Sequence, residues 1–332
     1  MPKKKKSSTK PRRKSRVKTT VSKLVPAVPA ATELFRARQK MRAQVARDRS
    51  RRYQEFLSEV EQPAETPTFE TALRSLAVVP GKRNLRILAE GDSWFEYPIP
   101  ITHGDGVIYQ LQKRLGYPIA NMAHHGLEVE QMLGLSMRQE IIRRLNDPQV
   151  KFDALLFSGG GNDIAGDQFC IWLKDAPPAD PPAEMLNTKA VSAVLAILEA
   201  EFRELVDLRD QFSPDTVILV HAYDFPPVTG KKACGMVGPW LKPSLDYAYK
   251  HLGVPTPDPK DEFVVVKTLL EMFGNMLNGI AADSNVKKFV VVPTQGTLSA
   301  DDSDWQNEIH PSSAGFTKIA AKFQTALGSV FP

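Results

Sequence analysis

The chain has 332 residues, of which 42% are hydrophobic and 24% are charged. This composition excludes a wholly disordered or collagen-like chain and allows one large domain or two small ones. Uninterrupted apolar runs, such as residues 154–157 and 290–292, are far shorter than the roughly 18 to 20 residues that a membrane-spanning helix needs. We therefore expect a soluble protein.

The net charge of +5 divides into two regions of opposite sign. Residues 1–52 contain 19 Lys and Arg but only two acidic residues, Glu33 and Asp48, which gives +17, whereas the remainder carries −12. A basic segment of this kind attracts an anionic partner, such as nucleic acid, acidic lipid or an acidic protein. A solvated tail is the alternative, since no recognised nucleic-acid-binding motif accompanies the charges.

The cysteines and the N-terminus suggest the cellular setting. Only Cys170 and Cys234 are present, which excludes a disulfide scaffold and a four-cysteine zinc site but leaves a single bridge open. The apolar stretch 24–31 is short, contains two prolines and follows a long basic run, so no cleavable signal peptide is predicted. We expect a cytoplasmic protein, with leaderless export and organelle targeting left open.

The first quarter of the chain is predicted to precede the main domain. Residues 1–32 lack hydrophobic periodicity and are rich in Lys, Arg, Ser, Thr and Pro, so we expect a disordered arm. Residues 33–62 contain good helix formers and a thin apolar stripe, which predicts a basic helix lying on the surface. Prolines then mark a linker over residues 63–83.

Residues 84–330 alternate short apolar runs with longer helical patterns. The runs predict strands at residues 85–89, 118–122, 154–157, 217–220 and 289–292, and the helical patterns cover 128–146, 187–211, 261–281 and 312–327. This alternation predicts an α/β fold, a three-layer α/β/α sandwich around a five-stranded parallel sheet, with ligands bound at the carboxyl ends of the strands. The proline-rich residues 225–260 are predicted to be an irregular insertion that covers or walls the pocket.

Polar, glycine-containing segments follow the first three predicted strands. Gly91-Asp92-Ser93 follows the first strand, Gly126 the second and Gly161-Asn162-Asp163 the third. A serine at a strand-to-helix turn can present its hydroxyl at the sheet edge, and glycine N–H or asparagine amide groups can donate to an oxyanion. The spacing fits neither a phosphate loop nor a dinucleotide-binding motif, so nucleotide binding is not expected.

His310 lies in a loop just before the last predicted helix. Alone, each of these segments is typical of an ordinary turn or loop. Together they bring a serine, a histidine and amide donors to one edge of the sheet, which is the set that nucleophilic catalysis needs.

These segments resemble the SGNH, or GDSL-type, hydrolases, which are esterases and lipases on a flavodoxin-like fold. Ser93, Gly126, Asn162 and His310 match in the family's order, spread across residues 84–330. The resemblance implies that Ser93 attacks an ester carbonyl, that His310 is its base, and that the Ser93 and Gly126 N–H groups and the Asn162 side chain hold the oxyanion. It implies a carboxylic ester substrate, whether lipid, acetylated carbohydrate or small ester, and neither a metal nor an organic cofactor.

One position departs from the family's pattern, which has an aspartate three residues before the histidine where this chain has Asn307. Asn307 can accept a hydrogen bond from the imidazole, but it can also donate one and select the wrong tautomer. Asp304, Glu308 or a backbone carbonyl can take the role, and we expect Asp304, because a folded-back loop would bring it beside the ring. The alternative function is a catalytically degenerate binding module that the basic arm recruits.

Other side chains near the predicted strand ends have secondary roles. Asp92 and Asp163 are expected to bond to backbone in their turns rather than to a metal ion. The residues expected to line the substrate site are Trp94, Phe95, His125, Tyr223 and Asp224.

Overall fold

The computed structural model describes residues 31–61, 83–98, 105–174, 182–233, 237–251, 258–300 and 303–332. Most of the predicted disordered arm and of the predicted linker lies outside these residues, as does Cys234, while Cys170 is an exposed free thiol. The chain forms two compact units, residues 1–46 and 47–332. Of the first unit, the structure describes the first half of helix α1 (Ala31–Glu61).

The second unit contains a single five-stranded sheet among its described residues. Its strands are β1 (Ile87–Gly91), β2 (Ala120–Asn121), β3 (Ala154–Ser158), β4 (Val217–His221) and β5 (Phe289–Val292). All neighbours are parallel, and the order β2-β1-β3-β4-β5 is that of flavodoxin-like folds. The five predicted strands are confirmed, with ends that differ by at most two residues. The strands could be predicted because strands buried on both faces of a sheet are continuous apolar runs in the sequence.

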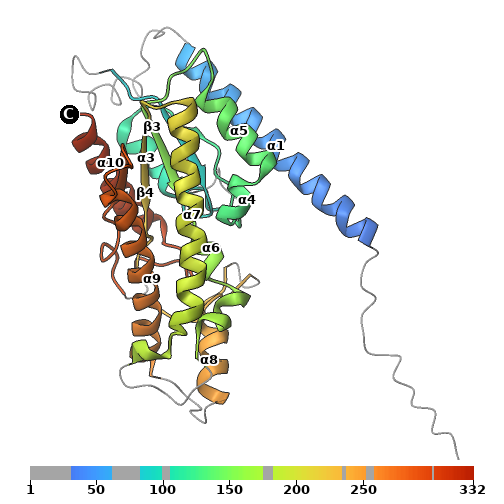
Figure 1. Cartoon of the computed structure of the whole chain (residues 1–332), viewed down its shortest axis with the longest axis vertical. Coiled ribbons are helices and arrows are strands. Elements are labelled where there is room, and N and C mark those ends of the chain that lie inside the picture. The colour runs from blue at the N-terminus through green and yellow to red at the C-terminus, as the bar shows by residue number, and fades with distance from the viewer. Residues whose placement is uncertain are drawn as a thin grey trace, which may run out of the picture. The chain divides into compact units, whose positions relative to one another are not determined.

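Helices cover both faces of this sheet. Right-handed crossovers put α3 (Val107–Leu115), which connects β1 to β2, on the face opposite the helices that connect β3 to β4 and β4 to β5. There α3 packs against α10 (Ser313–Val330). On the other face, α7 (Thr188–Phe212) packs against α9 (Pro259–Ala282), and the two lie side by side in front of β3 and β4 (Figure 1). The three-layer sandwich is therefore confirmed.

The predicted helix over residues 128–146 is divided in two. Gly134 has an extended backbone, ending α4 (Val129–Leu133) and preceding α5 (Leu135–Leu145). Five short helices were not predicted: α3, α6 (Gly161–Ile164), η1 (Asp167–Trp172), η2 (Pro182–Met185) and α8 (Lys242–His251). The expectation that residues 225–260 are irregular is thus wrong for α8. Helices this short depend on tertiary packing and have little periodicity to read.

Helix α9 is long and apolar enough, by length and composition, to span a membrane. In the fold it is a core helix, with Val265, Leu269, Phe273 and Leu277 buried at helical spacing. It packs against α7, β4 and β5. Its apolar composition therefore follows from contact with both the sheet and a neighbouring helix.

The second half of α1 belongs to the sheet-containing unit. Within residues 47–61, Tyr53 and Phe56 are buried, and Arg49 forms an ion pair with Glu90 in which both side chains are only 1% exposed. In this part the apolar stripe of the predicted helix faces the rest of the sheet-containing unit; the burial of Arg49, an arginine at an apolar position that meets a buried carboxylate, was not predicted.

Arg52, one turn further along α1, also points into this unit. It pairs with Glu96 and donates to the carbonyl oxygen of Ala123 at 2.9 Å. Arg52 therefore connects the loop that follows β1 to the loop that follows β2. Two of the basic residues counted in the segment 1–52 are thus neutralised inside the domain and are not available to an anionic partner.

Candidate active site

Ser93 and His310 meet at the carboxyl end of the sheet although they are 217 residues apart. Ser93 lies in the turn directly after β1, and His310 precedes α10, whose first turn is capped by the side chain of Ser312. The Ser93 Oγ lies 2.7 Å from the His310 Nε2. Both residues are largely buried, at 8% and 6% exposed. The predicted nucleophile and base are therefore within hydrogen-bond distance.

Asn307 fixes the tautomer of His310. Its Oδ1 accepts the backbone N–H groups of Ile309 and His310, at 3.2 and 3.0 Å, which identifies this atom as oxygen because a backbone N–H can only donate. The same Oδ1 lies 2.9 Å from the His310 Nδ1, so that nitrogen carries the proton. The Nε2 lone pair then faces Ser93. On its other side the Asn307 Nδ2 donates to the hydroxyl of Tyr97 at 2.9 Å.

The expectation that Asp304 orients His310 is wrong. Both ring nitrogens of His310 are engaged, one by Ser93 and one by Asn307. The Asp304 carboxylate accepts the backbone N–H of Ser299 at 2.8 Å and pairs with the Lys318 ammonium at 2.7 Å. Asp304 therefore stabilises the start of the loop and does not contact the imidazole.

Glu308 does not orient the imidazole either. Its buried carboxylate accepts backbone N–H groups from the insertion that follows β4, namely those of Gly230, Trp240, Leu241 and Lys242. The last of these begins α8. Glu308 thus attaches the insertion to the loop that carries His310.

Burial determines the protonation of the candidate base. Desolvation lowers the pKa of His310 to about 3, with a smaller contribution from nearby His125. Asn307 supplies an acceptor but no negative charge to oppose this shift. His310 is therefore neutral over the physiological pH range and can accept a proton from Ser93.

The three predicted oxyanion donors come from the loops after β1, β2 and β3. Within the part of the chain that the structure describes, the backbone N–H groups of Ser93 and Gly126 have no acceptor. The Asn162 side chain donates one N–H to the carbonyl oxygen of Leu127 at 2.8 Å, and its second N–H makes no bond to described residues. The Asn162 bond to Leu127 connects the loop after β3 to the loop after β2.

Asp92 and Asp163 bond to backbone, as expected. Asp92 accepts the N–H of Trp94 at 3.0 Å, within its own turn. Asp163 instead reaches the second loop, where both of its oxygens accept the N–H of Val129 at 3.2 Å. Burial raises the pKa of Asp163 to about 7.

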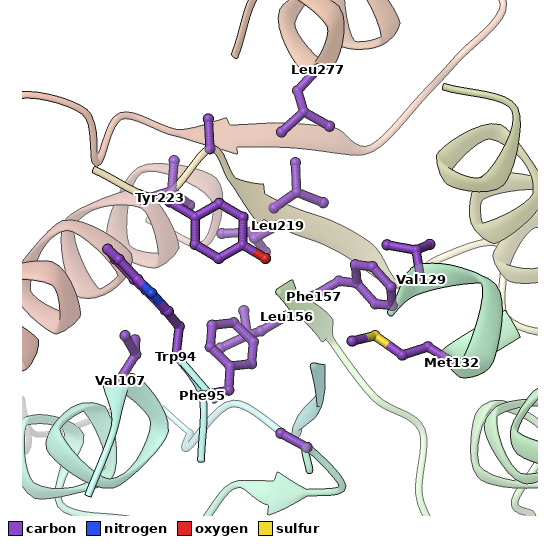
Figure 2. Close-up of a cluster of buried hydrophobic side chains, with 14 of the residues drawn as sticks. Trp94, Phe95, Val107, Val129, Met132, Leu156, Phe157, Leu219, Tyr223 and Leu277 are labelled. Carbon is purple, nitrogen blue, oxygen red and sulfur yellow. The ribbon is translucent and has the colours of Figure 1, made fainter. Parts of the chain in front are cut away.

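Tyr223 connects the loop after β1, which carries Ser93, to the loop after β3. Its hydroxyl donates to the Asp92 Oδ2 at 2.6 Å and accepts the backbone N–H of Gly161 at 2.8 Å. The residue has a positive φ of 60°, and its ring lies edge-on to Trp94 with centroids 5.2 Å apart (Figure 2). The hydroxyl is thus committed to the scaffold, while the ring faces the cavity beside Ser93.

A second serine–histidine pair lies deeper in the same region. The His221 Nε2 is 2.9 Å from the Ser158 Oγ, and the Ser158 hydroxyl donates to the Asp92 Oδ1 at 2.8 Å. The backbone N–H of Tyr223 donates to the His221 Nδ1 at 3.2 Å, so the proton of this ring is on Nε2. Burial lowers the pKa of His221 to about 3 and raises that of Asp92 to about 6.

The residues expected to line the substrate site are divided by the structure. Trp94, Tyr223 and Asp224 line the cavity beside Ser93, His125 is exposed outside it, and Phe95 is in the core. The carboxylate of Asp224 accepts four backbone N–H groups, those of Phe225, Gly296, Thr297 and Leu298. Its acceptor capacity is used to hold the loop after β5, so it is not a polar contact for substrate.

Several residues of the site escape sequence reasoning. Tyr97, Ser158 and His221 belong to no motif, and no local pattern distinguishes them from other buried polar residues. The burial of Arg49 could have been inferred from the sequence. Arg49 lies between Val45 and Tyr53 at helical spacing, so it interrupts an apolar stripe. A charged residue at such a position implies a buried partner of opposite charge.

No family model matches the chain, and no curated protein matches it. Solved structures that resemble it include a lipase from a goat rumen metagenome, with a TM-score of 0.46 and 15% identity over 73% of this chain and 97% of that one. A putative SGNH hydrolase from Slackia heliotrinireducens has a TM-score of 0.43 and 16% identity over 74% and 100%. A carbohydrate acetylesterase from Sinorhizobium meliloti has a TM-score of 0.41 and 15% identity over 75% and 100%. At such identities the likeness is one of fold.

Proposed function

We propose that the chain is a serine hydrolase that cleaves carboxylic esters through an acyl-enzyme intermediate. The observation that carries the proposal is the chain of hydrogen bonds from Ser93 to His310 to Asn307, in which two backbone N–H groups fix the tautomer. An imidazole held in this way presents its lone pair to the serine hydroxyl, which is the arrangement that a general base requires.

The reaction follows from these positions. The Ser93 Oγ bonds to the ester carbonyl carbon while its proton moves to the His310 Nε2, and the carbonyl oxygen becomes an oxyanion. In this proposal the N–H groups of Ser93, Gly126 and Asn162 donate to it, and such donors contribute about 3 to 4 kcal/mol each to lowering the barrier. The alcohol leaves with the proton from His310. Water then attacks the acyl-enzyme and transfers a proton to His310; the bond from the acyl carbon to the Ser93 Oγ breaks, His310 returns the proton to that oxygen, and the acid is released.

Asn307 in place of a carboxylate supports a modified triad. In a serine protease, the aspartate-to-asparagine change costs about 10⁴ in kcat because the imidazole adopts the wrong tautomer. Here the amide orientation is set by the backbone of Ile309 and His310, so that loss does not apply. The remaining cost is the missing negative charge beside the imidazolium that forms during the reaction.

The test is labelling with a fluorophosphonate together with hydrolysis of p-nitrophenyl acetate. The intact protein should be labelled at Ser93 and should hydrolyse the ester, and Ser93→Ala should lose both. Ser158→Ala is the matched control, since it removes the other buried serine hydroxyl that contacts a histidine, and it should remain labelled. If the intact protein is not labelled, the degenerate binding module recruited by the basic arm becomes the better description.

A further inference from the structure

A small, mainly apolar cavity lies beside Ser93. Its volume is about 60 Å³, and Ser93 and Asn162 are among the residues that line it. The apolar walls come from α6, η1, α9 and the insertion after β4, through Ile164, Phe169, Val266, Leu269 and Leu241. None of these residues was singled out by the motifs, because they are ordinary core side chains in sequence.

The position of the cavity identifies the part of an ester that would enter it. The leaving alcohol must lie within reach of His310, because that ring returns the proton to the alcohol oxygen. His310 does not line the cavity, whereas Ser93 and Asn162, which contact the carbonyl group in the proposed mechanism, do. The cavity is therefore on the acyl side of the scissile bond.

The volume limits the acyl group. An apolar protein cavity of about 150 Å³ is large enough to hold a benzene molecule. The cavity beside Ser93 has less than half that volume, so it accommodates a short linear chain and excludes a ring. Apolar walls offer a water molecule too few hydrogen-bond partners, so filling the space with methylene groups is favourable.

The wall formed by the insertion is fixed in place. Leu241 is 4% exposed, and its own backbone N–H donates to the Glu308 carboxylate at 2.7 Å. Glu308 directly follows Asn307, and it also holds Lys242 at the start of α8 through a bond of 2.9 Å. The wall is thus attached to the catalytic loop and does not yield to a longer chain.

We infer that this cavity is the acyl-binding site and that it restricts the hydrolase to linear acyl groups of about two to four carbons. The inference rests on the proposed function. Gly126 and His125 do not line this cavity and are exposed.

The chain-length profile of the intact protein is the first test. With p-nitrophenyl esters of acetate, butyrate, octanoate and laurate, kcat/KM should peak at acetate or butyrate. It should fall by at least about tenfold at octanoate, because each methylene that does not fit an apolar pocket of this size costs about that factor or more. Equal or higher kcat/KM for octanoate or laurate would overturn the inference.

Two substitutions in the same helix sharpen the test. Leu269→Ala enlarges the cavity, whereas Leu277→Ala removes an equally buried leucine of α9 that does not line it. Leu269→Ala should raise the octanoate-to-butyrate ratio of kcat/KM by at least about tenfold, and Leu277→Ala should leave the ratio unchanged. If both variants keep the ratio of the intact protein, the cavity is not the acyl site. Leu241→Ala enlarges the cavity from the wall formed by the insertion. It should raise the same ratio of kcat/KM, which keeps the test available if Leu269→Ala does not fold.

The result also separates this inference from the proposed function. Labelling of Ser93 with ester hydrolysis that is independent of chain length would overturn the acyl site alone. Absence of both labelling and hydrolysis in the folded protein would overturn both.

Discussion

The two serine–histidine pairs of this protein differ in the direction of one hydrogen bond. Ser93 and His310 are separated by 2.7 Å, and Ser158 and His221 by 2.9 Å, and burial lowers the pKa of both histidines to about 3. In the first pair the imidazole donates through Nδ1 to Asn307 and accepts from the serine. In the second pair Nδ1 accepts a backbone N–H, so the imidazole donates to the serine.

This difference shows that proximity does not make a base. His221 has its proton on the nitrogen that faces Ser158, so it cannot take up the serine proton, and Ser158 in turn donates to Asp92. The second pair is fully buried and acts as part of the scaffold under the first loop. The group that contacts Nδ1 of each ring decides which pair can react: Asn307 accepts from His310, whereas the backbone N–H of Tyr223 donates to His221.

The largest expected effect comes from replacing the two histidines in turn. His310→Gln should lower kcat for p-nitrophenyl acetate by about 10⁴ or more, because the base is lost. His221→Gln should change kcat by less than about tenfold and lower the free energy of unfolding by about 1 to 3 kcal/mol, since a buried hydrogen-bond network is disturbed. Steady-state kinetics and urea denaturation measure the two quantities. Similar losses of kcat in both variants would contradict the distinction between the pairs.

Removing Asn307, which accepts the Nδ1–H of His310, should have the next largest effect on kcat. Asn307→Leu deletes the acceptor of the His310 Nδ1–H and frees the ring to adopt the tautomer of His221. We expect kcat to fall by about 10³, which is about tenfold less than the cost of a wrong tautomer in a serine protease, because the leucine variant loses no negative charge. The ¹⁵N chemical shifts of the His310 ring should show the proton moving to Nε2. A loss of less than tenfold would mean that Asn307 does not control the tautomer.

A charge at the same position should change the pH profile. Because the pKa of His310 is lowered to about 3, kcat/KM of the intact protein should show no loss attributable to this ring until the pH approaches 3. In Asn307→Asp a carboxylate beside Nδ1 favours the imidazolium, so the pKa of His310 rises, typically by about one to three units.

The acidic fall in kcat/KM should therefore move to higher pH by the same amount in Asn307→Asp. The two backbone N–H groups that donate to the Asn307 Oδ1 are in place to donate to the new carboxylate, so the variant should fold. Comparison with Asn307→Gln, which keeps the amide, isolates the effect of charge. Superimposable pH profiles of the Asp variant and the intact protein would show that His310 is not the titrating base.

The smallest effect tests the scaffold that the two pairs share. Tyr223→Phe removes the donor to Asp92 and the acceptor of the Gly161 N–H, and it should lower kcat by about tenfold with little change in KM. Tyr53→Phe is the matched control, because it also removes a tyrosine-to-aspartate hydrogen bond, of 2.8 Å to Asp147, but away from the site. Both should lose about 1 kcal/mol of stability, and an equal effect on kcat would argue against a positioning role for Tyr223.

The sequence was sufficient for the sheet and for the residues on its edge. Buried parallel strands such as residues 154–157 are continuous apolar runs, and polar motifs at their ends meet because the strands are parallel. Ser93, Asn162 and His310 could therefore be placed together without coordinates.

The connections between these residues could not be predicted in the same way. In the sequence, the negative charge of Asp304 favours it over Asn307 as the partner of His310. In the fold, backbone N–H groups of the same turn orient the Asn307 amide so that its oxygen contacts the His310 Nδ1. The link from His221 to Ser158 crosses from β4 to β3, and no local pattern encodes such a contact. Acidic and basic side chains in a sequence indicate what charges exist, while their partners depend on the packed fold.

The burial of Arg49 determines where the sheet-containing unit can be cut. A fragment that begins at residue 84, where the α/β pattern starts, would leave Glu90 in the core without its cation three residues before Ser93. Removing one partner of a buried ion pair typically costs about 3 to 5 kcal/mol, a large part of the stability of a domain. A fragment that begins at residue 47 keeps the pair and the aromatic contacts of Tyr53 and Phe56. A fragment of this chain that should fold independently therefore starts in the middle of a helix.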